Sequence, residues 1–194
     1  MQKHVKVTRP RLLPSGSHDT RRNLPSKSAQ KRRESNFLKK FENAYFVGNS
    51  GRPLASRELA VEGFGRADLV WLVWSGNENH EDFTALALRH RVRLTAIEGK
   101  VSDWRKGLQQ AFRYRYFAHR SLLVLPMQTA KTAAQFLDTF RQMRVGLWGF
   151  DEASGRLHKW CTPRSARPMN EKAWRKALRV FESGLKLRKV SERL

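Results

Sequence analysis

The first regular pattern along the chain is a set of apolar residues at helical spacing, which begins at Phe37. They recur every three or four positions, so they form one face of a helix that begins near Phe37. Ser35 or Asn36 can cap this helix, and the Gly, Asn, Ser and Pro residues of 48–53 can end it. The face consists of Phe37, Leu38, Phe41, Tyr45 and Phe46.

The pattern then changes to runs of branched and aromatic residues that are typical of strands. One strand is predicted over 56–62 and a second over 67–74, with Gly63 and Gly65 between them. Because so few residues join them, the two strands should pair as an antiparallel hairpin. A third strand is predicted over 92–98, and the polar stretch 75–81 reads as a loop.

In the second half of the chain, predicted helices alternate with short buried strands. Residues 83–88 fit either a short helix or an irregular insertion. Ser102 or Asp103 can cap the helix that follows the third strand. The elements predicted next are a helix over 103–117, a strand over 120–125 and a helix over 129–143, whose inward residues are Ala133, Phe136, Leu137 and Phe140. Two strands follow over 145–150 and 156–160, with a turn at 153–155. The last helix begins at Asn170 and has Trp174, Leu178, Phe181 and Leu185 on one face.

This order predicts an α/β fold. A hairpin followed by a strand–helix–strand unit implies a mixed central β-sheet flanked by helices on both faces. Residues 1–35 read as a disordered basic tail, with ten lysines and arginines against Asp19 and Glu34. Residues 36–194 are expected to form a single domain.

The charge of the chain indicates a polyanionic partner. The 194 residues include 39 basic and 17 acidic side chains, a formal net charge of +22. Neutralising phosphates supplies most non-specific affinity for nucleic acid, so the charge predicts a nucleic acid, either DNA or RNA, as the partner. The alternatives for the charge are a protein that is kept soluble by it and a ribosome-like RNA-binding protein. For the basic tail, the alternative is a solvated extension without a function of its own.

Other features narrow the class of protein. One cysteine, Cys161, can form neither a disulfide framework nor a cysteine-based zinc site, and the six histidines lack paired ligand spacing. No apolar run approaches the roughly 20 residues of a membrane span. The N-terminus has no apolar stretch typical of a secretory signal, so we expect a cytoplasmic protein.

Candidate chemistry gathers at the end of the third strand. Glu98 and Lys100 are two residues apart and project to the same side, and Asp68 begins the neighbouring strand. If the strands are adjacent, Asp68 and Glu98 converge and repel unless a cation lies between them. Mg²⁺ or Mn²⁺ would suit two carboxylates, with the carbonyl of Gly99 as a further ligand. A surface ion pair is the ordinary interpretation of such a Glu-x-Lys pair.

The next helix adds two polar candidates. Gln110 and Tyr114 are four residues apart and lie on one flank, which can face the same site. Gln110 would bond to Lys100 or a phosphate, and Tyr114 would contact the backbone. Solvation of Gln110 and rim packing of Tyr114 are the alternatives.

The run Glu98-Gly-Lys100, Asp103-Trp104, Gln110-Ala111 and Tyr114, followed by 122–126, resembles the central block of the PD-(D/E)XK nuclease superfamily. Residues 65–70 resemble its segment around the metal-binding aspartate, with Ala67 where the family name has proline. The resemblance covers roughly residues 37–126 and points to its RecB-like and Holliday-resolvase-like branches.

The resemblance implies a restriction-endonuclease-like α-β-β-β-α-β core and Mg²⁺-dependent cleavage of DNA. It makes Asp68 and Glu98 metal ligands, Lys100 the catalytic lysine, and Gln110 with Tyr114 the helix motif. The helical glutamate of the family corresponds to Glu42, with Glu58 as competitor.

We therefore expect a metal-dependent deoxyribonuclease, either an endonuclease or an exonuclease. Arg66, Lys106 and Arg113 are candidate nucleic-acid contacts beside the site. The alternatives are a catalytically silent nuclease fold that binds nucleic acid and an unrelated basic DNA- or RNA-binding protein. A homodimer is compatible with the resemblance, but the sequence does not determine the oligomeric state.

Overall fold

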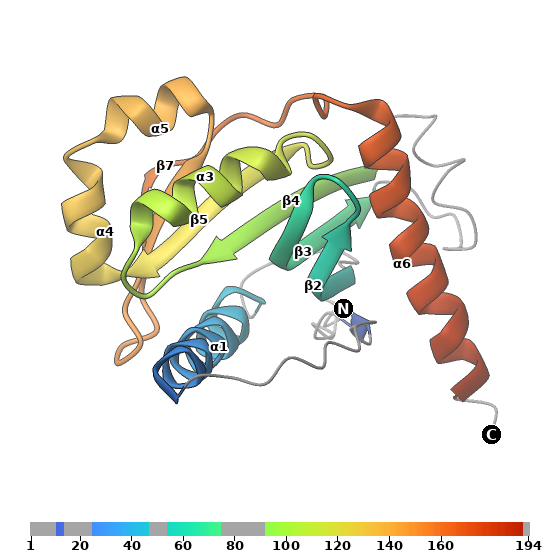
Figure 1. Cartoon of the computed structure of the whole chain (residues 1–194), viewed down its shortest axis with the longest axis horizontal. Helices are drawn as coiled ribbons and strands as arrows, with labels where there is room; N and C mark the ends of the chain where they lie inside the picture. The colour runs from blue at the N-terminus through green and yellow to red at the C-terminus, as the bar shows by residue number, and fades with distance from the viewer. Residues whose placement is uncertain (1–10, 14–24, 47–53, 75–91, 192–194) are drawn as a thin grey trace, which may run out of the picture.

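The computed structural model describes residues 11–13, 25–46, 54–74 and 92–191, which form an α/β fold around one mixed sheet (Figure 1). The strands are β1 (Arg11–Leu13), β2 (Leu54–Val61), β3 (Gly65–Trp74), β4 (Val92–Gly99), β5 (Arg120–Pro126), β6 (Gly146–Phe150) and β7 (Leu157–Cys161). The helices are α1 (Pro25–Phe46), α3 (Trp104–Tyr114), α4 (Met127–Ala134), α5 (Leu137–Met143) and α6 (Glu171–Ser191).

The strands of the described sheet lie side by side in chain order. β2, β3 and β4 are antiparallel neighbours, which confirms the predicted hairpin. β4, β5 and β6 run parallel, and β7 returns antiparallel to β6, which confirms the predicted C-terminal hairpin. The carboxyl ends of β4, β5 and β6 therefore lie at the same end of the sheet.

Helices cover both faces of the sheet, as the sequence predicted. Phe37 and Phe41 of α1 pack with alternate residues of β3, β4 and β5, such as Leu69 and Ile97. The opposite face is covered by α3, α4, α5 and α6, through two further apolar clusters (Figure 1). Alternation along each strand sends successive side chains to opposite faces, so both layers bury apolar surface.

The first helix corrects the prediction of a disordered tail over 1–35. α1 begins at Pro25, twelve residues before the predicted start, so residues 25–35 are helical. Proline is tolerated at a first helical position, and the Lys, Arg, Gln and Ala residues that follow are good helix formers. Residues 11–13 form β1, whereas 1–10 and 14–24 lie outside the described residues, as does the predicted loop and insertion over 75–91.

The predicted helix over 129–143 was wrong, because it is two helices. The backbone of Phe136 has φ −109° and ψ 31°, which ends the α-helical course between α4 and α5. Phe136 is 42% exposed instead of facing inward, and its ring lies 5.2 Å from that of Trp104. α3 ends at Tyr114 instead of Phe117.

The last helix begins as predicted. The side chain of Asn170 accepts a hydrogen bond from the N–H of Ala173 at 2.9 Å, which caps α6. Leu178 and Phe181 are fully buried against the sheet. Within the described ranges, no helix is both long enough and apolar enough to cross a membrane.

Candidate active site

The β2–β3 hairpin is irregular where Asp68 lies. Glu58 of β2 has a positive φ of 51°, which is uncommon for a residue other than glycine. The β3–β4 ladder begins one residue beyond Asp68, at the pair Leu69–Ile97. Asp68 instead accepts a hydrogen bond from the N–H of Gly99 through Oδ2, at 2.9 Å. Its side chain thus spans the opening between β3 and the end of β4.

Glu98 is held at the same place from the other side. Its side chain is 1% exposed, on the sheet face that α3 covers. The hydroxyl of Tyr114 contacts Glu98 Oε2 and donates to the carbonyl of Arg66 at 2.6 Å. Tyr114 therefore ties α3 to both β3 and β4, and this buried position replaces the rim packing considered for it.

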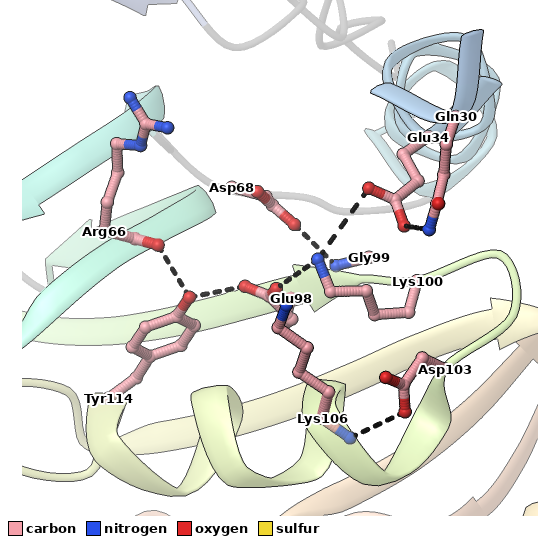
Figure 2. Close-up of polar contacts among 10 residues, drawn as sticks. All are labelled: Gln30, Glu34, Arg66, Asp68, Glu98, Gly99, Lys100, Asp103, Lys106 and Tyr114. Atoms are coloured by element: carbon pink, nitrogen blue, oxygen red, sulfur yellow. Dashed lines mark hydrogen bonds and ion pairs between the residues drawn. The ribbon is translucent and has the colours of Figure 1, made fainter. Parts of the chain in front are cut away.

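Lys100 completes the cluster just past the end of β4. Its Nζ lies 3.0 Å from Glu98 Oε1 and 3.8 Å from Oε2 of Glu34, which belongs to α1. Figure 2 shows these contacts converging with Asp68 around the end of the strand. The structure therefore brings Asp68, Glu98 and Lys100 together, as predicted, and adds Glu34.

Burial changes the proton affinity of Glu98. Desolvation, with the nearby charge of Asp68, raises the pKa of Glu98 from 4.5 to about 7, although Lys100 and Tyr114 act in the opposite direction. The Tyr114 hydroxyl has one hydrogen, which cannot fully serve both Glu98 and the Arg66 carbonyl. A protonated Glu98 resolves this conflict by donating to the tyrosine oxygen.

The same surroundings also shift the pKa values of Asp68 and Lys100. Burial raises the pKa of Asp68, and the hydrogen bond from Gly99 and the charge of Lys100 offset part of that rise. Burial alone would lower the pKa of Lys100, but the carboxylates of Glu98, Asp68 and Glu34 outweigh it and raise the pKa. Lys100 therefore remains an ammonium group beside two carboxyl groups that resist ionisation.

A cavity of about 490 Å³ opens onto this cluster. Gln110 lines it, and the buried Oε1 of Gln110 has no hydrogen-bond partner among the described residues. The remaining lining comes from α1, the β2–β3 hairpin and Lys100. The lining residues are Lys31, Glu34, Ser35, Leu38, Glu42, Arg57, Glu58, Arg66, Asp68, Leu69, Lys100 and Gln110.

Glu42 and Glu58, the two candidates for the metal-binding glutamate that the resemblance implies, both form ion pairs with arginines. Glu42 is 5% exposed and pairs with Arg57, whose Nε donates to Glu42 Oε2 at 2.7 Å. Glu58 lies 3.7 Å from Arg66 in a largely exposed ion pair. Both line the cavity, but Glu34 is the α1 carboxylate that contacts Lys100.

The sequence interpretation missed Glu34 because it placed residues 1–35 in a disordered tail. A signal was present in the helical spacing. Glu34 precedes Leu38 by four positions and Phe41 by seven, which places it on the apolar face of α1. Extending that face by one turn toward the N-terminus would have found it.

The other predicted site residues divide into backbone and surface roles. Gly99 contacts Asp68 through its N–H, whereas its carbonyl had been expected to act as a ligand. Arg66, Lys106 and Arg113 are exposed, so each can meet a large ligand. Figure 2 shows the Lys106 side chain extending from α3 toward the Glu98 side of the cluster.

Asp68 and Glu98 are the carboxylates that could hold a divalent cation at this site. In the part of the chain that the structure describes, no three His, Cys, Asp or Glu side chains form a metal-binding group. Asp68 and Glu98 offer hard oxygens, and Mg²⁺ is commonly bound through one or two carboxylates with waters and substrate phosphates. Glu98 Oε1 is buried and forms an ion pair with Lys100 but no well-aligned hydrogen bond. These residues fit a cation that completes its shell with water and substrate.

Comparisons with known proteins found no match to this chain among protein-family models, curated proteins or solved structures.

Proposed function

We propose that this protein is a Mg²⁺- or Mn²⁺-dependent nuclease of the PD-(D/E)XK type, which hydrolyses phosphodiester bonds of DNA. The observation that supports the proposal best is the meeting of Asp68, Glu98 and Lys100 at the end of β4, beside a cavity. Burying two acids beside one lysine is costly, because a single ammonium group cannot fully balance two carboxylates, and such clusters are frequent at functional sites.

The proposal gives each side chain a role. Asp68 and Glu98 would hold the cation, which when bound polarises the scissile phosphate and lowers the pKa of a bound water. Lys100 would orient that water or stabilise the charge that builds on the phosphate. Gln110 lines the same cavity and would hydrogen-bond a phosphate oxygen through its amide.

The order of elements also supports this class of enzyme. α1, β2, β3, β4, α3 and β5 follow one another in the α-β-β-β-α-β order of the restriction-endonuclease-like core. Asp68 lies on β3, Glu98 on β4 with Lys100 just after it, and Gln110 and Tyr114 on α3, which is the order of the family motifs.

The net charge of +22 favours a long polyanion over a small substrate. Arg66 is an exposed residue of β3, and Lys106 and Arg113 are exposed residues of α3, so all three would contact backbone phosphates. We propose DNA as the substrate, and RNA is included in the test.

The test is a cleavage panel on the full chain. Linear duplex, supercoiled plasmid, single-stranded DNA, branched DNA and RNA are incubated with Mg²⁺, with Mn²⁺ and with a chelator. We expect metal-dependent cleavage of DNA that Lys100→Ala reduces by at least about 100-fold, as for removal of one charge-stabilising group. Lys131→Ala, which removes an exposed lysine of α4, is the matched control and should cleave normally.

The same panel separates the competing functions. Tight binding of DNA with no cleavage of any substrate would refute the nuclease proposal and leave a nucleic-acid-binding protein. Calorimetric binding of Mn²⁺ that disappears in Asp68→Asn would then favour a silent nuclease fold over an unrelated basic protein.

A further inference from the structure

A second cluster of charge lies at the opposite end of the parallel strands. Arg120 begins β5 and Arg144 lies two residues before β6, so both are near the amino ends of these strands. The connection 162–170 between β7 and α6 packs over them, and the N–H of Ala166 donates to the carbonyl of His119 at 2.9 Å. We call the small hollow that results the arginine pocket. Its guanidinium groups belong to Arg115, Arg120, Arg144, Arg164 and Arg167.

The arginine pocket carries positive charge without a counter-charge. None of the described residues that line it is acidic. Arg115 donates to the carbonyl of Met143 and Arg120 to that of Pro163, so two guanidinium groups are fixed by the backbone. His119 is held in the same way, because its Nδ1 accepts a hydrogen bond from the N–H of Leu94.

The other three arginines are available to a ligand. In the described part of the chain, no hydrogen bond or ion pair involves the side chains of Arg144, Arg164 and Arg167, and all three are exposed. Arg144 lies close enough to Arg115 for the two charges to repel. An anion between them would relieve that repulsion, and guanidinium groups bind phosphate through paired hydrogen bonds.

The size of the arginine pocket selects among phosphate-bearing ligands. Its volume is about 140 Å³, whereas pockets for whole small-molecule ligands are about 300 Å³ or more. Its lining has no Phe, Tyr or Trp on which a base could stack. The space therefore suits one phosphate group of a longer chain better than a complete nucleotide.

The position also suits a polymer that reaches the carboxylate site. Arg120 pairs with Thr95, three positions before the Glu98–Leu123 pair, so it lies about 10 Å back along the strands. That separation corresponds to about three steps of a duplex at 3.4 Å each. We infer that the arginine pocket binds a backbone phosphate of the nucleic acid, a few nucleotides from the bond cleaved at the carboxylate site. This inference rests on the proposed function for the cleavage and on the arginine pocket alone for the binding.

The test compares two double variants in a chelator, where cleavage is blocked. Arg164→Ala/Arg167→Ala removes two charges from the arginine pocket, and Lys131→Ala/Arg179→Ala removes two exposed charges elsewhere. Binding of a labelled 20-base-pair duplex and of single-stranded DNA is measured across salt concentrations. We expect the first variant to bind at least about tenfold more weakly than the control and to lower the salt slope by about 1 to 2.

Each outcome distinguishes the two proposals. Equal affinities and salt slopes for the two variants, with melting curves that show both folded, would overturn the inference. Submillimolar binding of inorganic phosphate or a nucleoside triphosphate, lost in the pocket variant while DNA binding is unchanged, would assign the arginine pocket to a free ligand and also overturn it. Weakened DNA binding in a protein that cleaves nothing would support the inference while the nuclease proposal fails.

Discussion

Replacing Glu98 with glutamine should make the stability of the protein less sensitive to pH. The folded-state pKa of Glu98 is about 7 against an ordinary value of 4.5. Between those two values the folded protein holds a proton that the unfolded chain has lost, so stability falls as pH rises through the window. The stabilising effect is fully present below the unfolded pKa and is gone above the folded one. At 1.36 kcal/mol per pKa unit, this loss is about 3 kcal/mol.

Glutamine suits the measurement because it resembles the protonated acid. Its amide can donate to the Tyr114 oxygen, and its carbonyl can face Lys100, as the two oxygens of Glu98 do. The variant should therefore fold, and it should lack the loss of stability above about pH 7. Glu62→Gln is the matched control, because Glu62 is 90% exposed and pairs with Lys176 on the surface.

The assay is urea unfolding in a chelator from about pH 5 to about pH 8.5, a range that covers most of the window. The wild type should lose about 2 to 3 kcal/mol more than Glu98→Gln across this range, or about 5 to 10 °C in melting temperature. Identical pH profiles would refute the reasoning, because they would mean that Lys100 keeps Glu98 ionised throughout. In the wild type at alkaline pH, added Mn²⁺ should restore stability, since a cation compensates the ionised carboxylates.

Three further substitutions test the surroundings of the site. Glu42→Ala should cost about 1 to 3 kcal/mol in urea unfolding, because it leaves the half-buried Arg57 without its carboxylate, while Mn²⁺ affinity stays near wild type. Gly99→Ala should destabilise by about 1 to 3 kcal/mol, since an added Cβ would lie 2.7 Å from Leu38 Cγ and push α1 away from β4; an unchanged melting temperature would contradict this packing. Asp68→Asn should weaken Mn²⁺ binding by calorimetry at least about tenfold while the Gly99 hydrogen bond keeps the fold, and undiminished binding would remove Asp68 from the site.

Local patterns in the sequence determined most of the strands and the main chemical candidates. Short runs of branched and aromatic residues between turn residues placed β2, β3, β4 and β5 to within a few residues, because a buried strand needs apolar side chains along most of its length. The spacing of Glu98 and Lys100 on one strand, with Asp68 at the start of the preceding one, was enough to predict that they meet. Asp68 belongs to β3 and Glu98 to β4, and the antiparallel pairing of Leu69 with Ile97 sets Asp68 beside the end of β4.

Contacts between distant elements were decided only by the tertiary structure. α1 begins twelve residues before its apolar face, and Glu34 reaches Lys100 from the opposite layer of the sheet. The pairing of Glu42 with Arg57 and the break at Phe136 likewise depend on neighbours far away in the chain. The arginine pocket joins residues that follow α3, the start of β5, Arg144 between α5 and β6, and the connection 162–170, none of which forms a motif by itself. Local propensity sets where a helix or strand can form, but packing and charge pairing across layers select its ends and the partners of its polar side chains.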